Sequence, residues 1–160
     1  MPGRTLFLDT NVFLYSAGAD HPLKAPAVRW LDAAAEGDFR AVTSAEVLQE
    51  ILHVLIRRGR RDEALELVRS ALDLCSDVLP VDRRAVHKAL ELLETHSGLS
   101  PRDALHAATV RVHGLAEILS ADDDFDDLDG IVWVELAAEA ESPPARTVSD
   151  AESDGSSGSS

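Results

Sequence analysis

The 160-residue chain has little cysteine, few aromatic side chains and no long apolar run. Cys75 is its single cysteine, which excludes an intramolecular disulfide framework and fits a reducing cytoplasm. Aromatic residues make up only 4%, so smaller aliphatic side chains must fill a core that 45% hydrophobic residues can supply. No segment is long and apolar enough to cross a bilayer, and Asp9 interrupts the short apolar run near the start. These absences predict one soluble, cytoplasmic domain with no membrane association.

Positive charge is also scarce, and the formal net charge is −14. A polyanion should repel such a chain, which argues against nucleic-acid binding. The six acids and one arginine from Glu135 onward account for part of this charge and leave about −9 on the body. Acids gathered around a bound cation would reverse the local field. Bulk charge therefore lowers the expectation of a nucleic-acid partner without excluding one.

Short apolar runs alternate with segments of helical periodicity. The predicted strands are at residues 5–8, 39–43, 78–81, 117–121 and 131–134, and the predicted helices at 12–17, 25–36, 44–58, 62–75, 83–96 and 101–113. This alternation predicts an α/β fold with a mostly parallel sheet. From about Ser142 the chain turns to serine, proline, glycine and acids, which cannot pack a core. We expect a folded domain over residues 1–140 and a disordered acidic Ser/Gly-rich tail over 141–160.

Two aspartates follow predicted strands. Asp9 ends the run TLFL, and Asp122 comes directly after EILSA. Open α/β folds place ligands at this carboxyl edge of the sheet, although Asp9 is equally suited to capping the next helix. In the acidic run DDDFDDLD, Asp124 is a possible auxiliary and the remaining acids are expected in a solvated turn: Asp123, Asp126, Asp127 and Asp129.

Two further acids lie in predicted helices. Thr43 and Glu46 fit a capping box, whereas Glu50, one turn later among apolar residues, has no such role. Glu50 either lies on the solvent side or points inward, where it needs a cation. Asp103 fits the third helical position after Ser100 as N-cap, so capping alone can explain it. The same position would also hold a carboxylate rigidly at a helix N-terminus, whose dipole lowers its pKa.

Together the four acids form one pattern: two aspartates at strand ends, one helical glutamate without a capping role and one aspartate at a helix start. Oxygen-only ligand sets suit Mg²⁺ or Mn²⁺. Carboxylates cannot ionise side by side without a cation, because like charges raise each other's pKa. A convergent set of acids therefore predicts a bound metal ion.

The chain resembles the PIN-domain ribonucleases, particularly the VapC-like toxins of toxin–antitoxin pairs. The matching segments are LDTNVFLY at 8–15, TSAEVLQEIL at 43–52, LSPRDALHAATV at 99–110 and ILSADDDFDDL at 118–128. The resemblance extends over about residues 4–136. It implies a PIN-like three-layer fold in which helices flank a mostly parallel central sheet.

The resemblance also implies a site and an activity. It makes Asp9, Glu50, Asp103 and Asp122 an acidic site for Mg²⁺ or Mn²⁺, with support from Thr10, Asn11, Ser120 and Asp124. Such a site activates water to hydrolyse RNA phosphodiester bonds, and the family implies a homodimer and an inhibitory antitoxin partner. Because positive charge is scarce, RNA binding would depend on a few arginines, which could equally cap helix ends or lie solvated. They are Arg57, Arg58, Arg60, Arg61 and Arg102.

Two other functions remain open. A haloacid-dehalogenase-like phosphohydrolase would also begin with an aspartate at a strand end, but Asn11 stands where its second acid is needed. A non-catalytic PIN-like binding module is the other, although all four acids are intact. His106 is interpreted as a packed or surface helical histidine rather than a base, and Cys75 as a small core residue.

Overall fold

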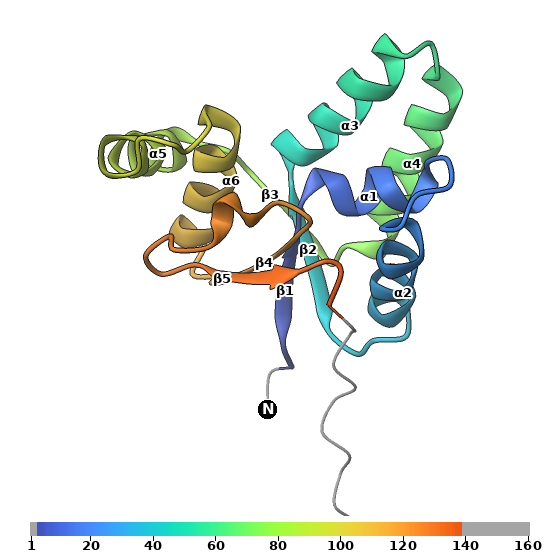
Figure 1. The fold of residues 1–160 in the computed structure, drawn as a ribbon, viewed down its shortest axis with the longest axis horizontal. Helices are drawn as coiled ribbons and strands as arrows, with labels where there is room; N and C mark the ends of the chain where they lie inside the picture. Colours follow the sequence, from blue (N-terminus) through green and yellow to red (C-terminus); the bar gives the residue numbers. More distant parts are fainter. Residues whose placement is uncertain (1–2, 139–160) are drawn as a thin grey trace, which may run out of the picture.

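The computed structural model describes residues 3–138, which form a five-stranded sheet flanked by helices (Figure 1). The strands lie in the order β3-β2-β1-β4-β5, and every neighbouring pair is parallel. Their bounds are Thr5–Leu8 for β1, Arg40–Ser44 for β2, Asp77–Leu79 for β3, Glu117–Ser120 for β4 and Val132–Glu135 for β5. The expected α/β fold is confirmed, whereas the expected tail over 141–160 lies outside the described residues.

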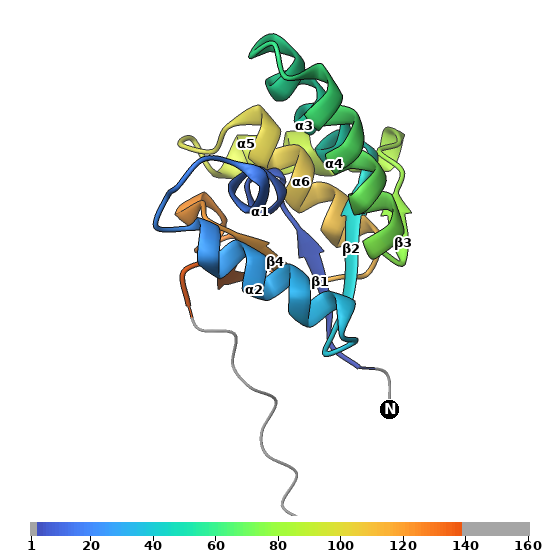
Figure 2. The same cartoon turned by 90° about the vertical axis from the view of Figure 1, so that its right-hand side faces the viewer.

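The helices cover both faces of this sheet. Their bounds are Thr10–Ala17 for α1, Lys24–Ala35 for α2, Ala45–Arg57 for α3, Arg61–Leu74 for α4, Arg83–Thr95 for α5 and Pro101–Val112 for α6. Helices α5 and α6 lie on one side and α1 and α2 on the other, while α3 and α4 project as a helical hairpin (Figures 1 and 2). This is the expected three-layer arrangement. No helix in residues 3–138 has the length and apolarity that crossing a membrane requires.

The central strands and α6 supply much of the core. Residues 6–8 of β1 are fully buried, as are Ile118 and Leu119 of its neighbour β4. Such buried apolar runs are typical of a parallel sheet that is covered on both faces. Small residues on α6 are also fully buried, namely Ala104, Ala107 and Ala108. They let α6 pack closely against the sheet and carry its first turn to the edge where β1 and β4 end.

Two local predictions at helix starts were wrong. Helix α1 begins at Thr10 rather than near residue 12, because the carboxylate of Asp9 accepts a hydrogen bond from the Thr10 amide. Thr43 does not cap α3: its hydroxyl donates to the Leu8 carbonyl at 3.0 Å, and Ser44 caps the helix instead. Strand β2 runs through Ser44, so Thr43 remains in the sheet.

Candidate metal centre

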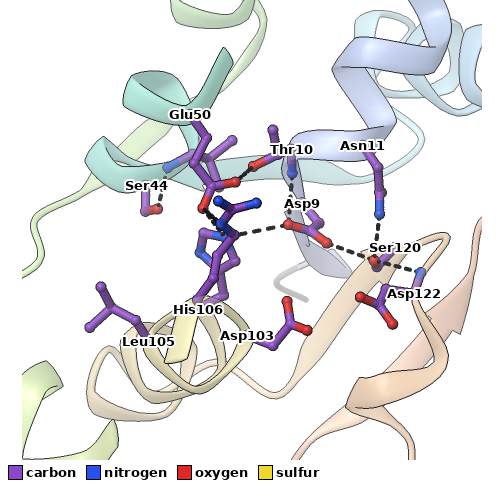
Figure 3. Close-up of polar contacts among 12 residues, drawn as sticks. Asp9, Thr10, Asn11, Ser44, Glu50, Asp103, Leu105, His106, Ser120 and Asp122 are labelled. Atoms are coloured by element: carbon purple, nitrogen blue, oxygen red, sulfur yellow. Dashed lines mark hydrogen bonds and ion pairs between the residues drawn. The ribbon is translucent and has the colours of Figure 1, made fainter. Parts of the chain in front are cut away.

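Four acidic side chains from four elements meet at the carboxyl edge of the sheet. Asp9 follows β1, Asp122 follows the adjacent parallel strand β4, Glu50 comes from α3 and Asp103 from the first turn of α6 (Figure 3). Asp9 and Glu50 are each 5% exposed and Asp103 is 7% exposed, while Asp122 is partly buried. The fold thus brings together all four acids that the sequence singled out.

Asp9 has two structural partners and still faces the centre. Its Oδ1 accepts from the Thr10 amide at 2.7 Å, and its Oδ2 accepts from the Ser120 hydroxyl at 2.7 Å. Burial raises the pKa of Asp9, against the opposing charge of His106 and the hydrogen bond from Ser120. Asp9 therefore caps α1 and also presents a rigidly held carboxylate, so the capping role and a place in the acidic site are compatible.

Ser120 and Asn11 connect the end of β4 to α1. The Ser120 hydroxyl accepts from the Asn11 side-chain amide at 3.1 Å and from the Asp122 backbone amide at 3.0 Å. The Asn11 side-chain oxygen accepts from the Ala121 amide at 3.1 Å. Because this network includes contacts to both Asp9 and Asp122, it fixes the two strand-end acids relative to each other.

The acidic run divides as expected. Asp122 caps the short 3₁₀ turn Asp123–Phe125 by accepting from the Asp124 amide at 3.0 Å, and Phe125 is fully buried. The remaining acids of the run face solvent: Asp123, Asp124, Asp126, Asp127 and Asp129. Asp124 nevertheless reaches the centre, since one carboxylate oxygen each from Asp103, Asp122 and Asp124 lie within 4.8 Å of one another.

Asp103 is held in its ionised form at an electrostatic cost. Burial raises its pKa to about 7, and the charges of Asp122 and Asp9 add to the effect. The expectation that the helix dipole lowers this pKa was wrong, because burial and two neighbouring acids outweigh it. Ser100 caps α6 as predicted, accepting from the Asp103 amide at 3.1 Å, so the Asp103 carboxylate is left to face Asp122 (Figure 3).

Glu50 points inward and is surrounded by donors. Its Oε2 accepts from the Thr10 hydroxyl at 2.6 Å, and its Oε1 lies 3.1 Å from both His106 Nε2 and Arg102 Nε. Burial opposes ionisation of Glu50, but the hydrogen bonds from His106 and Thr10 outweigh burial and lower its pKa. The cation that an inward-pointing glutamate needs is therefore present in the protein itself.

His106 has a larger role than the sequence indicated. It is packed, as interpreted, with 1% exposure, but its Nε2 also lies 3.6 Å from Asp9 Oδ1 and thereby bridges Asp9 and Glu50. Burial lowers the pKa of His106, yet the Glu50 hydrogen bond and the charge of Asp9 raise it overall. The available signal was its spacing: His106 follows Asp103 by three residues, which puts both on one helix face.

Comparison with known proteins identifies the family of this chain. Residues 6–131 match the PIN domain family. The chain belongs to the PIN-domain family. It is 38% identical over 126 residues to ribonuclease VapC13 of Mycobacterium tuberculosis, covering 79% of this chain and 96% of that protein. It is 41% identical over 120 residues to ribonuclease VapC23 of the same species, covering 73% and 92%.

Solved structures share the PIN fold. VapBC2 of Rickettsia felis, bound to a DNA fragment from its promoter, has a TM-score of 0.66 at 14% identity, covering 82% of this chain and 98% of that chain. VapC20 of Mycobacterium tuberculosis, a toxin that cleaves the sarcin–ricin loop, has a TM-score of 0.61 at 25% identity, covering 74% and 91%. The expected PIN-like fold is thereby confirmed.

The arginines of this PIN domain are not all near the acids. Arg102 does lie near them, since it contacts Glu50 and its side chain is 63% exposed. It also borders a pocket of about 540 Å³ that is lined by Asp103, Asp122 and Asp124. Arg57 and Arg58 lie at the exposed end of α3, where Arg57 is seven residues, roughly 10 Å, beyond Glu50. Arg60 pairs with Glu63, and Arg58 and Arg60 line a second pocket of about 380 Å³, whose lining also includes Asn11.

The donor set of this PIN domain fits a hard divalent cation. Asp103, Asp122 and Asp124 offer carboxylate oxygens, which Mg²⁺ and Mn²⁺ prefer. None of the ion pairs formed within residues 3–138 involves any of these three acids. After burial, the charge of Asp122 is the largest cause of the raised pKa of Asp103, and a bound cation would offset that repulsion.

Proposed function

We propose that this PIN domain is a Mg²⁺- or Mn²⁺-dependent endoribonuclease and the toxin of a toxin–antitoxin pair. The observation that carries the proposal is the meeting of Asp9, Glu50, Asp103 and Asp122 at one edge of the sheet, with the charge of Asp103 and Asp122 uncompensated. The similarity to ribonucleases VapC13 and VapC23 over nearly their whole length supports RNA as the substrate.

Each side chain of the centre has a part in this reaction. Asp103 and Asp122 would hold the ion, with Asp124 and Asp9 beside them. A bound Mg²⁺ or Mn²⁺ would lower the pKa of an attacking water and stabilise the extra charge on the phosphate oxygens. Thr10, Asn11 and Ser120 hold Asp9 and Asp122 in place, which keeps the carboxylates in position without reorganisation during the reaction.

Substrate capture by so acidic a chain needs local positive charge. The exposed guanidinium of Arg102 at the border of the acidic pocket is well placed to contact a phosphate that lies over the centre. Arg57 and Arg58 are candidates for contacts farther along an RNA strand or with an acidic protein, because they are exposed on the α3–α4 hairpin.

Similar solved structures support a protein partner. Solved structures similar to this chain include a toxin–antitoxin complex from Klebsiella pneumoniae and VapBC-5 of Mycobacterium tuberculosis, a member of the VapBC family of toxin–antitoxin systems, which supports a cognate antitoxin protein as partner. We extend the proposal to a homodimer in the cytoplasm. Membership of the PIN family displaces the haloacid-dehalogenase alternative. A non-catalytic binding module remains an outcome of the experiment below.

Induced expression of the protein without its antitoxin should generate recurrent new RNA 5′ ends in the host cell. Transcriptome-wide mapping of 5′ ends measures this and identifies the cleaved sequence at the same time. Asp9→Asn, expressed to the same level, should not generate these ends, because one of the centre's buried carboxylates is lost. Identical 5′-end profiles for wild type and Asp9→Asn would favour the non-catalytic binding module.

A further inference from the structure

The four acids of the centre divide into two pairs with opposite surroundings. Asp9 and Glu50 are bridged by His106, whose Nε2 lies 3.6 Å from Asp9 Oδ1 and 3.1 Å from Glu50 Oε1. Asp103 and Asp122, together with Asp124, have no ion-pair partner within residues 3–138. We propose that His106 fills the place between Asp9 and Glu50 that a second divalent ion would need, so that the centre holds one ion, at Asp103, Asp122 and Asp124.

The first argument concerns the space between Asp9 and Glu50. An ion that joined these carboxylates would have to approach Glu50 Oε1 to about 2.0–2.1 Å. His106 Nε2 already lies 3.1 Å from that oxygen and faces Asp9 (Figure 3). Because His106 is 1% exposed on the tightly packed helix α6, its ring cannot withdraw without opening the core.

The second argument concerns the chemistry of the ring nitrogen. An ionised carboxylate only accepts hydrogen bonds, so Nε2 must carry the hydrogen that it shares with Glu50. While Nε2 carries that hydrogen it has no lone pair to offer, so His106 meets Glu50 as a hydrogen-bond donor and not as a metal ligand. The imidazole therefore occupies the space as a donor, and Glu50 needs no ion there.

The third argument concerns the oxygens of Glu50. Oε1 lies against both His106 Nε2 and Arg102 Nε, and Oε2 accepts a short hydrogen bond from Thr10. Two hydrogen bonds and the ion pair with Arg102 thus engage both oxygens of Glu50, which leaves it little capacity to bind an ion. Glu50 is therefore a positioning residue: it holds His106 between the acids and keeps the guanidinium of Arg102 at the border of the acidic pocket.

The remaining acids have the spacing that one ion requires. Oxygens on opposite sides of an octahedral Mg²⁺ are about 4 Å apart, and oxygens at adjacent positions are closer. One oxygen each from Asp103, Asp122 and Asp124 already lie within 4.8 Å of one another. Only small side-chain adjustments separate this arrangement from a ligand set, and the exposed Asp124 is free to make them.

This inference rests on the proposed metal-dependent function, and counting bound Mn²⁺ tests it without an activity assay. Full-length protein is titrated with Mn²⁺, and electron paramagnetic resonance measures the number of bound ions, their affinity and any coupling between two of them. Wild type should bind one ion per chain. Glu50→Gln should keep that stoichiometry and nearly the wild-type affinity, whereas Asp103→Asn should weaken binding at least about tenfold.

Removing the imidazole gives the positive test. His106→Ala should bind a second Mn²⁺ between Asp9 and Glu50, with the spectrum of a coupled pair, which a merely structural role for His106 does not predict. If His106→Ala does not fold, Glu50→Gln alone decides: a loss of affinity equal to that of Asp103→Asn overturns the inference. If wild-type protein binds two ions and cleaves RNA, the inference is overturned and the proposed function stands. If wild-type protein binds no ion, the inference and the proposed function are both overturned.

Discussion

Replacing Asp103 with asparagine should lower the rate of RNA cleavage by roughly 1,000-fold, because the bound ion contributes several kcal/mol and each 1.36 kcal/mol is tenfold in rate. Asparagine has the same shape but removes the charge of the most buried acid among the candidate ligands. Single-turnover cleavage of a labelled RNA at saturating Mn²⁺ measures the effect. Asp126→Asn, in the exposed part of the acidic run, is the matched control and should leave the rate unchanged.

The same substitution should stabilise the metal-free protein. Burial and two acidic neighbours raise the pKa of Asp103 from 3.8 to about 7, so between these values the folded protein binds a proton that the unfolded chain has released. The contribution of Asp103 to the free energy of unfolding is therefore present below about pH 4 and is lost as the pH rises through about 7. The free energy of unfolding lost over this pH range is at most roughly 4 kcal/mol, which corresponds to a fall on the order of 10 °C in melting temperature.

Thermal unfolding in chelator between pH 5 and 8 checks this pH dependence. The melting temperature of wild type should fall as the pH rises, and that of Asp103→Asn should fall less and exceed wild type at pH 8. Parallel curves for the two proteins would mean that Asp103 is not held at an electrostatic cost. A stabilised but inactive variant is the signature of a site residue, since a residue needed for folding gives the opposite result.

Replacing His106 with alanine should have the largest effect on stability among substitutions in the centre. The change leaves the buried carboxylates of Asp9 and Glu50 without their shared partner, and breaking such a buried pair typically costs about 3–5 kcal/mol. Urea unfolding of the metal-free protein measures the free energy of unfolding. Arg102 and Thr10 still contact Glu50, so the domain should remain folded at low temperature.

His87→Ala provides the control for this substitution. His87 lies on the exposed side of α5, and its replacement should change the free energy of unfolding by less than about 0.5 kcal/mol. Added Mn²⁺ should restore part of the stability lost in His106→Ala, because an ion then takes the place of the ring. Equal effects of the two histidine substitutions would contradict the bridging role of His106.

The positions of the acids could be predicted from the sequence because each depends on local rules. Asp9 and Asp122 directly follow strands that the apolar runs define, and adjacent parallel strands end at the same edge. Ser100 and Pro101 define the start of α6 and hence the place of Asp103. Periodicity also gave all six helices described in residues 3–138, with ends displaced by one or two residues.

What the sequence could not give depends on packing between distant elements. The contact of His106 with Glu50 joins residues 56 positions apart, and it exists only because α3 and α6 approach the same edge of the sheet. The pKa of Asp103 was predicted in the wrong direction because burial and the approach of Asp122 were not visible locally. Thr43 met the capping rule, but pairing of β2 with its neighbours kept it in the sheet.

The central claim is that a divalent ion held by these acids makes this PIN domain an RNA-cleaving enzyme. The most direct measurement is cleavage of labelled RNA by purified, antitoxin-free protein in Mn²⁺ or Mg²⁺, then in excess chelator, then after the ion is restored. The account predicts cleavage, complete loss and recovery for the wild type, with cleavage by Asp103→Asn lowered roughly 1,000-fold when the ion is present. Undiminished cleavage by the wild type in chelator, or equal cleavage by Asp103→Asn, would contradict it.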